Sequence, residues 1–582
     1  MKYNLSLKSL LKELLGYRKN IILGNILAIG ATTLTVLIPL FIPILVDELL
    51  LGKNHHVIEF IKSHFFELSL SGYVFLFLII TLFLRALGVF FAIWQNKLFI
   101  ETSKSITYKL RIKAIDHLKR VRLKEYEEME SGGVVSRLIS DIDTIDNFIG
   151  VTISKLIVSI LVLLFTSIVL IIINWKLALF IILTNPIVVY FTAKMARRVG
   201  FLKREENRAI EKFSELLNEV LTLFWQIRAS NKEDYFFDRV KKRALLLRDK
   251  AIDFAYRSDR AIRVSFLIFL SGYELFRSMG ILAVAYSNLS IGLMLAIFGY
   301  LWIMMTPTQD IINFQYALAN AKSAIKRVNE IFDLPIEKSG NKDPFFKDVE
   351  IKGEDIRFRY EDKDILKGVS FYFKPKGKIA IVGPSGSGKT TLANLLVGFY
   401  MPDSGKLKYN QIDIKDINLK ILREKVHLIL QSPKLFNDTM RFNLTLGKSF
   451  SQEEIKKAIK LVNLDTLIAS MPHGLDTKIG RDGIKLSGGQ RQRVAIARMI
   501  LQNPQVVIFD ESTSALDYHS EEQIFKNLEE FLRDKMVIII AHRLSTIEKC
   551  EDILVLEDGV VKDFGSWDEL RKKEEGYFAQ MI

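Results

Sequence analysis

Long apolar stretches without charged residues dominate the first half of the chain. The first covers residues 21–46, which as a helix rising about 1.5 Å per residue is long enough to cross a hydrocarbon core of about 30 Å. Five comparable stretches follow, two of them interrupted by isolated charges, at 73–96, 156–173, 177–193, 264–287 and 291–308. Six such segments predict six membrane-spanning helices, because buried helices of a soluble protein would mimic only one or two of them.

The connections between these stretches differ in charge. Segments 1–20, 101–148 and 194–263 carry 5, 9 and 18 lysines and arginines, whereas the other three connections carry 2, 1 and 0. Because short basic loops stay on the cytoplasmic side, both termini and the two long connections are predicted to be cytoplasmic. This distribution accounts for the net charge of +15 without a nucleic-acid partner.

The chain is predicted to divide into four regions. Residues 1–20 repeat leucines at the i, i+3, i+4, i+7 spacing of one helical face, which predicts an interfacial elbow helix, with an unstructured start as the alternative. Residues 21–330 form the membrane domain, whose long connections continue into the cytoplasm as helices. Residues 331–347 contain Gly, Asn and Pro and form the linker. Residues 348–582 are enough for one soluble domain.

The composition agrees with a membrane-embedded part and a water-soluble part in one chain. The sequence is 49% hydrophobic with a mean hydropathy of +0.20, yet 25% of its residues are charged. This apolar content argues against disorder, and the positive hydropathy argues against an ordinary soluble enzyme. The single cysteine, Cys550, excludes an intrachain disulfide framework and a cysteine-based zinc site.

A strand, a glycine-rich loop and a helix follow one another in the second half. The apolar run 378–382 leads into the sequence GPSGSGKT at 383–390, and a helical run follows. The pattern predicts a phosphate-binding loop, whose glycines let backbone N–H groups approach phosphate oxygens beside a helix N-terminus. Lys389 is predicted to reach the β- and γ-phosphates of ATP, and Thr390 to bind Mg²⁺. The expected nucleotide contacts are Gly383, Pro384, Ser385, Gly386, Ser387, Gly388, Lys389, Thr390 and Thr391.

Two further strands end in polar residues suited to ATP hydrolysis. The run 505–509 ends in Asp510 and Glu511, and the run 537–541 ends in His542. Asp510 suits Mg²⁺ coordination, and Glu511 can orient and deprotonate the attacking water. For His542 alone a structural histidine is the ordinary interpretation, but its place at a third strand end favours a catalytic role. Ligands bind at the carboxyl ends of strands in open α/β sheets, so these residues are predicted to face one crevice with Lys389.

The sequence LSGGQ at 486–490 begins a strongly helical run. Ser487 and Gln490 have the spacing of a capping box, so Ser487 can cap the helix N-terminus. Gly488 and Gly489 leave that N-terminus open to an anion, which predicts a second phosphate-binding element. A capped helix without a ligand is the alternative.

Together these motifs resemble the ATP-binding cassette (ABC) transporter family, specifically bacterial exporter half-transporters. The phosphate-binding loop, the LSGGQ signature, the Asp510–Glu511 pair, SALD at 514–517 and AHR at 541–543 occur in the family's order. Segment 131–141 resembles the exporter pattern after the second span. The resemblance covers essentially the whole chain and implies a polytopic α-helical membrane domain with six transmembrane helices, followed by an α/β P-loop nucleotide-binding domain.

The resemblance also implies further site residues and a partner. Gln431 matches the family's glutamine loop, which takes part in Mg²⁺ and water binding, and Tyr360 matches the aromatic residue that stacks on adenine. Asp517 matches a family residue at the nucleotide site. In the family each ATP lies between the phosphate loop of one cassette and the signature of the other, so a second copy of this chain is the expected partner, with a heterodimer as the alternative. Contacts with the cassettes are expected near 114–128 and 231–237.

One position departs from the family's pattern. Arg481 stands in segment 480–483, where the family usually has a glutamate before the signature. Either Asp482 takes the place of that glutamate with a shift of one residue, or Arg481 pairs with acids such as Glu233 or Asp234. The departure concerns coupling between the domains and leaves the ATPase prediction intact.

The predicted function is ATP-driven export or flipping of an amphipathic lipid, glycolipid or drug by alternating access in the bacterial inner (plasma) membrane, with ATP and Mg²⁺ as cofactors. An ABC-type membrane regulator without transport is the alternative, and six spans argue against a soluble DNA-maintenance ATPase. Arg85 and Lys155 lie in or beside spans, in surroundings that resemble those of lipid A flippases, and are the candidate substrate contacts. The sixth span lacks those flippases' basic residues, so a multidrug or other lipid exporter stays open.

Overall fold

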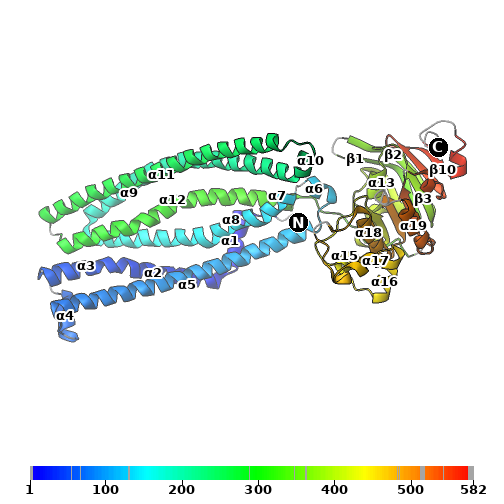
Figure 1. Cartoon of the computed structure of the whole chain (residues 1–582). Coiled ribbons are helices and arrows are strands. Elements are labelled where there is room, and N and C mark those ends of the chain that lie inside the picture. The colour runs from blue at the N-terminus through cyan, green and yellow to red at the C-terminus, as the bar shows by residue number, and fades with distance from the viewer. Residues whose placement is uncertain are drawn as a thin grey trace. The chain divides into compact units, whose positions relative to one another are not determined.

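The computed structural model of the chain divides into two compact units (Figure 1). The first contains Met1–Leu118 and Ser131–Asp333, and the second contains Lys119–Glu130 and Leu334–Ile582. The described part of the first unit is helical, whereas the second combines helices with two sheets. The structure describes all residues except 1–3, 54–55, 66, 129–130, 288, 347, 361–362, 481–482, 484, 511–517, 542, 574–577 and 579–582.

The second unit is built on a six-stranded sheet in the order β10-β9-β3-β8-β7-β6 and a four-stranded antiparallel sheet in the order β2-β1-β4-β5. In the larger sheet β3 pairs in parallel with β8 and β9, and β7 pairs in parallel with β6 and β8. The strands are β1 (Ile351–Tyr360), β2 (Lys363–Phe373), β3 (Gly377–Val382), β4 (Ser404–Tyr409), β5 (Ile412–Asp413), β6 (Val426–Ile429), β7 (Val506–Asp510), β8 (Met536–Ile540), β9 (Asp552–Glu557) and β10 (Val560–Gly565).

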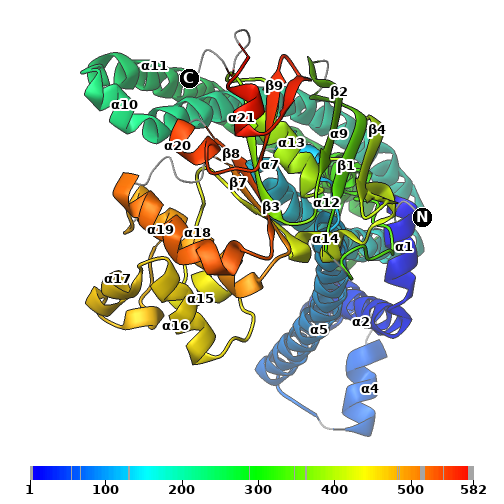
Figure 2. The same cartoon turned by 90° about the vertical axis from the view of Figure 1, so that its right-hand side faces the viewer.

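Helices cover both faces of the larger sheet (Figure 2). Alternate residues of β3 enter two different buried clusters, Ala380 and Val382 in one, Ile379 and Ile381 in the other. A strand buried on both faces has no polar side, which explains the apolar sequence of residues 379–382. The helices of this unit are α6 (Leu123–Glu128), α13 (Lys389–Leu396), α14 (Leu419–Lys425), α15 (Met440–Thr445), α16 (Gln452–Leu461), α17 (Asp465–Ser470), α18 (Gly488–Gln502), α19 (Tyr518–Leu532), α20 (Leu544–Ile547) and α21 (Trp567–Leu570).

Long helices make up the first unit, which confirms the polytopic helical membrane fold. Its helices are α1 (Leu7–Leu15), α2 (Arg18–Leu37), α3 (Phe41–Pro43), α4 (His56–His64), α5 (Leu70–Leu118), α7 (Ser131–Ser136), α8 (Ile142–Asn147), α9 (Ile153–Thr222), α10 (Phe224–Ala229), α11 (Glu233–Tyr286) and α12 (Ile291–Asp333). Within the described residues, five helical segments are long and apolar enough to cross a membrane: Arg18–Leu50, Leu70–Leu118, Gly133–Phe180, Glu233–Tyr286 and Ile291–Asp333.

Helix α9 contains the connection predicted between the third and fourth apolar stretches. Its regular geometry breaks at Asn174, where φ is −159° and ψ is 101°. The side-chain oxygen of Asn174 accepts the N–H of Leu177 at 3.1 Å and so caps the helix that follows. The two stretches are therefore separate arms of α9, the second of which begins after this break.

Helix α1 is held by protein contacts at its start. The side chain of Asn329 on α12 accepts the Leu5 N–H at 2.8 Å and donates to the Leu5 carbonyl at 2.7 Å. Leu5 and Leu10 are buried in an apolar cluster with residues of α5 and α12, whereas Leu11 and Leu15 remain exposed. Part of the leucine face expected to lie in the membrane interface is thus buried against protein.

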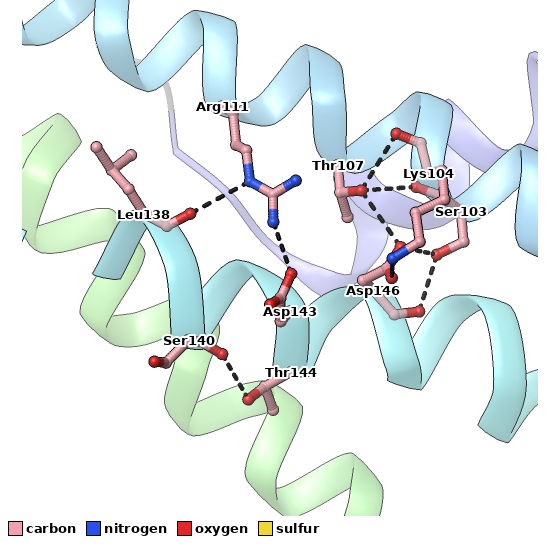
Figure 3. A network of polar contacts seen from close by, with 9 residues as sticks. All are labelled: Ser103, Lys104, Thr107, Arg111, Leu138, Ser140, Asp143, Thr144 and Asp146. Carbon is pink, nitrogen blue, oxygen red and sulfur yellow. Dashed lines mark hydrogen bonds and ion pairs between the residues drawn. The ribbon is translucent and has the colours of Figure 1, made fainter. Parts of the chain in front are cut away.

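Acidic residues of α8 bind residues 103–111 of α5 (Figure 3). The buried Asp146 carboxylate accepts hydrogen bonds from Ser103 at 2.6 Å and from Thr107 at 3.3 Å, and lies 2.5 Å from the Lys104 ammonium. One turn earlier, Asp143 pairs with Arg111 at 2.6 Å. These contacts fix α8 against α5 through charge-assisted bonds.

The exporter-like segment after the second span connects to α12. Arg137 pairs with Glu330 at 2.5 Å. Four residues later, the Asp141 carboxylate accepts hydrogen bonds from two nitrogens of the Arg327 guanidinium. The Asp141 carboxylate is 8% exposed, so the arginine compensates a charge that is largely removed from water. The arginine and the aspartate of this exporter-like segment therefore serve to bind the segment to α12 within the membrane unit.

The first membrane-spanning segment is irregular between Val36 and Leu50. A 3₁₀ turn at Ile38–Leu40 and a π-helical stretch at Ile44–Leu50 interrupt the α-helix, and this segment contains Pro39 and Pro43. Proline lacks an N–H group, so it leaves carbonyl groups of the preceding turn without their helical partner. Such groups need other partners at membrane depth, because lipid offers none.

Helix α12 contacts this irregular segment at two points. The buried hydroxyl of Tyr300 donates to the Val36 carbonyl at 2.6 Å. Near the start of α12, the Asp47 carboxylate accepts the Gly292 N–H at 2.9 Å and the Ser290 hydroxyl at 2.5 Å. A Cβ atom on Gly292 would lie 2.6 Å from the Pro43 Cα, so only glycine permits this close approach.

Replacing Gly292 by alanine is expected to destabilise the membrane unit, because the added methyl group overlaps backbone atoms that cannot move independently. Overpacking of this kind costs about 1–3 kcal/mol. Thermal unfolding of the purified chain in nanodiscs, followed by tryptophan fluorescence, measures the effect. Gly200→Ala is the control, because nothing lies within 4 Å of a Cβ at that helical position. Equal melting temperatures for both variants would contradict the close contact.

Candidate nucleotide-binding site

The glycine-rich loop between β3 and α13 has the backbone of a phosphate-binding loop. Gly386 and Gly388 have φ of +82° and +102°, in the region that side chains disfavour. At Gly383 a Cβ atom would collide with the Leu556 carbonyl oxygen. The loop then passes directly into α13, so the first N–H groups of that helix point toward the loop.

The Lys389 ammonium lies over this loop. It donates to the carbonyl oxygens of Gly383 at 2.8 Å and Pro384 at 2.9 Å. The side chain is 6% exposed, so a cation is held at the centre of a loop rich in N–H donors. This arrangement suits a ligand with several negative oxygens, such as the β- and γ-phosphates of a nucleotide.

Two oxygen donors for a divalent cation meet at the carboxyl ends of β3 and β7. The hydroxyl of Thr390 lies 3.2 Å from Asp510 Oδ1, and the Asp510 side chain is buried. Hydroxyl and carboxylate oxygens are the ligands that Mg²⁺ prefers beside phosphate. These residues therefore fit Mg²⁺, as predicted from their positions in the sequence.

Gln431 follows β6 at the same edge of the sheet. Ile429 of β6 pairs with Phe509 of β7, so Gln431 and Asp510 both lie at carboxyl strand ends. Gln492, which is 1% exposed on α18, donates to the Gln431 carbonyl at 3.2 Å. Sequence reasoning overlooked Gln492, although a glutamine on a helix face that is otherwise apolar is a recognisable signal.

The predicted catalytic residues Glu511 and His542 and the predicted nucleotide contact Asp517 lie outside the described residues. Their neighbours are described: Asp510 pairs with Ile540 across β7 and β8, and both strands run in the same direction. The two chain segments that carry the predicted base and the predicted histidine therefore leave the sheet at adjacent strand ends. This agrees with the expected crevice at the carboxyl edge.

The signature sequence forms the N-terminus of α18. Ser487 accepts the Gln490 N–H at 3.2 Å, and the Gln490 side chain accepts the Ser487 N–H at 2.8 Å, so the predicted capping box is present. Gly488 and Gly489 occupy the first turn and add no side chains there. The arrangement leaves an accessible helix N-terminus, which suits an anion.

Tyr360 ends β1 within a group of aromatic rings. Its ring lies 5.4 Å from that of Tyr400 and 4.9 Å from that of Phe358, both in edge contact. Tyr400 donates to Glu127 of α6 at 2.5 Å. Burial raises the pKa of Tyr400 and the hydrogen bond to Glu127 raises it further, so the phenol stays protonated and remains a donor.

Segment Lys119–Glu130 belongs to the second unit, although membrane helices precede and follow it in the sequence. Val121 pairs with Ile336, and the Arg122 N–H donates to the Pro335 carbonyl at 3.1 Å. The cassette contact expected near 114–128 is thus located in its second half. Asn231–Phe237 lies in the first unit, where Glu233 is 3.7 Å from Arg228, and Arg481 falls outside the described residues.

The candidate substrate residues have few polar contacts. Arg85 on α5 and Lys155 near the start of α9 are both exposed on the isolated chain, and neither belongs to an ion pair among the described residues. By contrast, Arg277 pairs with Glu274 on the same helix at 2.6 Å. One turn after Lys155, the buried Ser159 donates to Asp310 of α12 at 3.2 Å.

Comparison with known proteins agrees with this fold. The family described as ABC transporter matches residues 366–514, and the ABC transporter transmembrane region matches residues 21–308. The ATP-dependent lipid A-core flippase of Legionella pneumophila (strain Paris) is 30% identical over 494 residues, which covers 82% of each chain. The multidrug resistance-like ATP-binding protein MdlB of Buchnera aphidicola subsp. Schizaphis graminum is 29% identical and covers 99% of this chain and 97% of its own.

A solved structure of a bacterial Atm1-family ABC exporter with ATP bound is also similar, with a TM-score of 0.82 and 25% identity over 97% of both chains. Fold and site thus define a multi-pass membrane protein whose transmembrane region is joined to an ATPase domain. The chain belongs to the ABC transporter family. It is an ATP-driven exporter, which is the class predicted from its motifs, and the regulator and DNA-maintenance alternatives are not favoured.

Proposed function

We propose that two copies of this chain form a homodimer that moves an amphipathic lipid, glycolipid or drug across the bacterial inner membrane by alternating access. The observation that carries the proposal is the capped N-terminus of α18. It is a second anion-binding element, separate from the phosphate loop between β3 and α13. In the resembled family such an element completes the nucleotide site of the other copy. Two identical chains would then form two complete sites, with termini and cassettes in the cytoplasm.

Each proposed site divides the work of hydrolysis among named residues. Lys389 and the loop N–H groups bind the β- and γ-phosphates, and Tyr360 contacts the adenine ring. Thr390, Gln431 and Asp510 hold Mg²⁺, which neutralises charge that develops on the phosphates. Glu511 accepts a proton from the attacking water, and His542 binds the γ-phosphate edge. Ser487 and the first turn of α18 from the second copy cover the triphosphate.

Exposed large apolar residues on α10 and on the adjoining ends of α9 and α11 support docking on the second copy. Trp225 of α10 is 86% exposed, and Tyr235 and Leu221 nearby in sequence are also exposed. Large apolar side chains in water at a helical turn are typical of an interaction surface. The resemblance assigns cassette contacts to segment 231–237, which follows α10 directly. We therefore assign this surface, Leu221, Trp225 and Tyr235, to the cassette of the partner copy.

The substrate class follows from unpaired charge in the spans. An arginine in a membrane-spanning helix costs about 2.5 kcal/mol or more unless it faces protein or water. Arg85 has no ion-pair partner among the described residues, whereas Arg277 has Glu274. We propose that Arg85, with Lys155, faces the inward-open cavity of the dimer and attracts the anionic group of an amphiphile such as a phosphorylated lipid.

Mixing two defective chains tests the shared site. Lys389→Ala removes a phosphate-binding cation, and Ser487→Arg blocks the signature helix, so each pure dimer is expected to lose most ATP hydrolysis. A mixed dimer places both defects in one site and leaves the other site complete. Vanadate-sensitive ATPase of co-expressed, doubly tagged dimers is expected to recover to about half the wild-type rate, as one of two equal sites implies. Mixtures as inactive as either pure variant would contradict a shared site with independent turnover.

Glu511→Gln is expected to keep ATP binding and nearly abolish hydrolysis, because the amide keeps the size of the carboxylate but cannot accept the proton. ATP should then remain bound in a stable dimer, which size-exclusion chromatography with radiolabelled ATP measures. The exposed Glu530→Gln on the neighbouring α19 is the control. Turnover close to wild type in Glu511→Gln would remove this residue from the catalytic role.

Arg85→Ala is expected to weaken stimulation of the ATPase by anionic lipids more than stimulation by neutral drugs. Each variant is reconstituted in neutral vesicles, and its rate is divided by its own unstimulated rate. Arg277→Ala is the matched control, because that arginine already has a local partner. If both substrate classes lose stimulation equally, or if the control behaves the same way, Arg85 does not select an anionic group.

A further inference from the structure

One ion pair connects the two chain segments that border the predicted catalytic residues. Glu521 lies in the first turn of α19, four residues after Asp517, and Arg543 directly follows His542. Arg543 Nη1 contacts Glu521 Oε2. The Glu521 side chain is 8% exposed, and that of Arg543 is 42% exposed. The pair therefore joins the first turn of α19 to the residue that lies directly before α20.

The Glu521–Arg543 pair is more buried than the adjacent ion pair of Glu522 with Lys549. A largely buried carboxylate is costly unless a cation compensates it, and Arg543 is that cation. Glu522, the next residue, pairs with Lys549 at 3.8 Å, and both of those side chains are more than half exposed. An exposed pair of this kind contributes little. Two adjacent glutamates on one helix thus differ in burial and in the strength of their contacts.

Each partner of the buried pair is itself anchored. The Arg543 carbonyl accepts the N–H groups of Thr546 at 3.1 Å and Ile547 at 3.2 Å, which starts α20. Helix α19 packs on the sheet through Phe525, whose ring lies 5.4 Å from that of Phe509 on β7. Because both ends are fixed, the ion pair limits the relative movement of the two segments.

We infer that Glu521 and Arg543 form a positioning pair for ATP hydrolysis, which fixes the first turn of α19 relative to the start of α20, the two described elements next in the chain to the proposed catalytic residues. Hydrolysis needs the histidine and the base on the same phosphate, and a displacement of about 1 Å lowers rates by about 100-fold. Neither residue of the pair is proposed to contact the nucleotide. The inference rests on the proposed roles of Glu511 and His542.

The decisive variant is Glu521→Gln, compared with Glu522→Gln. Steady-state ATPase of the full-length dimer is expected to show kcat at least about tenfold lower for Glu521→Gln, with KM for ATP within about twofold, because positioning affects the reaction rather than binding. Glu522→Gln should keep both constants within about twofold of wild type. Equal effects of the two variants, or a Glu521→Gln defect confined to KM, would overturn the inference.

A cavity of about 70 Å³ borders Glu521, which leaves room for a substituted side chain. If the single variant nevertheless fails to fold because Arg543 is left unpaired, the double variant Glu521→Gln/Arg543→Gln removes both charges. The folded double variant is expected to keep ATP affinity and show the lowered kcat. Wild-type kcat in the folded double variant would show that the charged contact does not position the site.

His542→Ala separates this inference from the proposed site. A wild-type rate in His542→Ala would refute the role of the histidine, and with it the basis for the pair. A slow His542→Ala together with a normal Glu521→Gln would refute only the pair. Charge exchange, Glu521→Arg with Arg543→Glu, is expected to restore at least part of kcat. A reduced melting temperature with unchanged kcat in Glu521→Gln would indicate a purely structural contact.

Discussion

Polar groups inside a membrane protein need partners from the protein, and in this chain α12 supplies many of them. Toward its N-terminus, α12 binds the irregular first span through the Tyr300 hydroxyl and donates the Gly292 N–H to the Asp47 carboxylate. At the other end Arg327 binds Asp141 and Asn329 binds the backbone of Leu5. Since lipid cannot replace the contact between Tyr300 and Val36, movement of this part of α12 requires the first span to move or to exchange partners.

The cassette follows a different physical rule. Its parallel strands β3, β7 and β8 bury both faces, so their only accessible polar groups lie at the strand ends. The phosphate loop, Asp510 and the segment before His542 are therefore brought together by strand direction alone. Contacts such as Tyr400 with Glu127 then link this edge region to α6, which comes from the loop between two membrane helices.

These two parts differ in how far sequence reasoning could reach. The phosphate loop and the Ser487 capping box could be predicted because each depends on residues close together in the chain. The break at Asn174 could be predicted for the same reason, since three residues between two apolar stretches leave no room for a longer connection. Part of the leucine face of α1, expected in the membrane interface, is instead buried against α5 and α12, because a helical face identifies an apolar surface but not what covers it.

The sequence by itself determined the family and the order of the two regions, and it predicted the phosphate loop and the capped signature helix, because these are encoded in local motifs and in hydrophobic periodicity. Only the tertiary structure decided which polar residues pair over long distances. Glu521 and Glu522 are adjacent residues of the same type, yet Glu521 is buried against Arg543 and Glu522 is exposed beside Lys549. That difference depends on where α19 meets β8 and α20, and the packing of distant elements sets the partner and the dielectric environment of each charge.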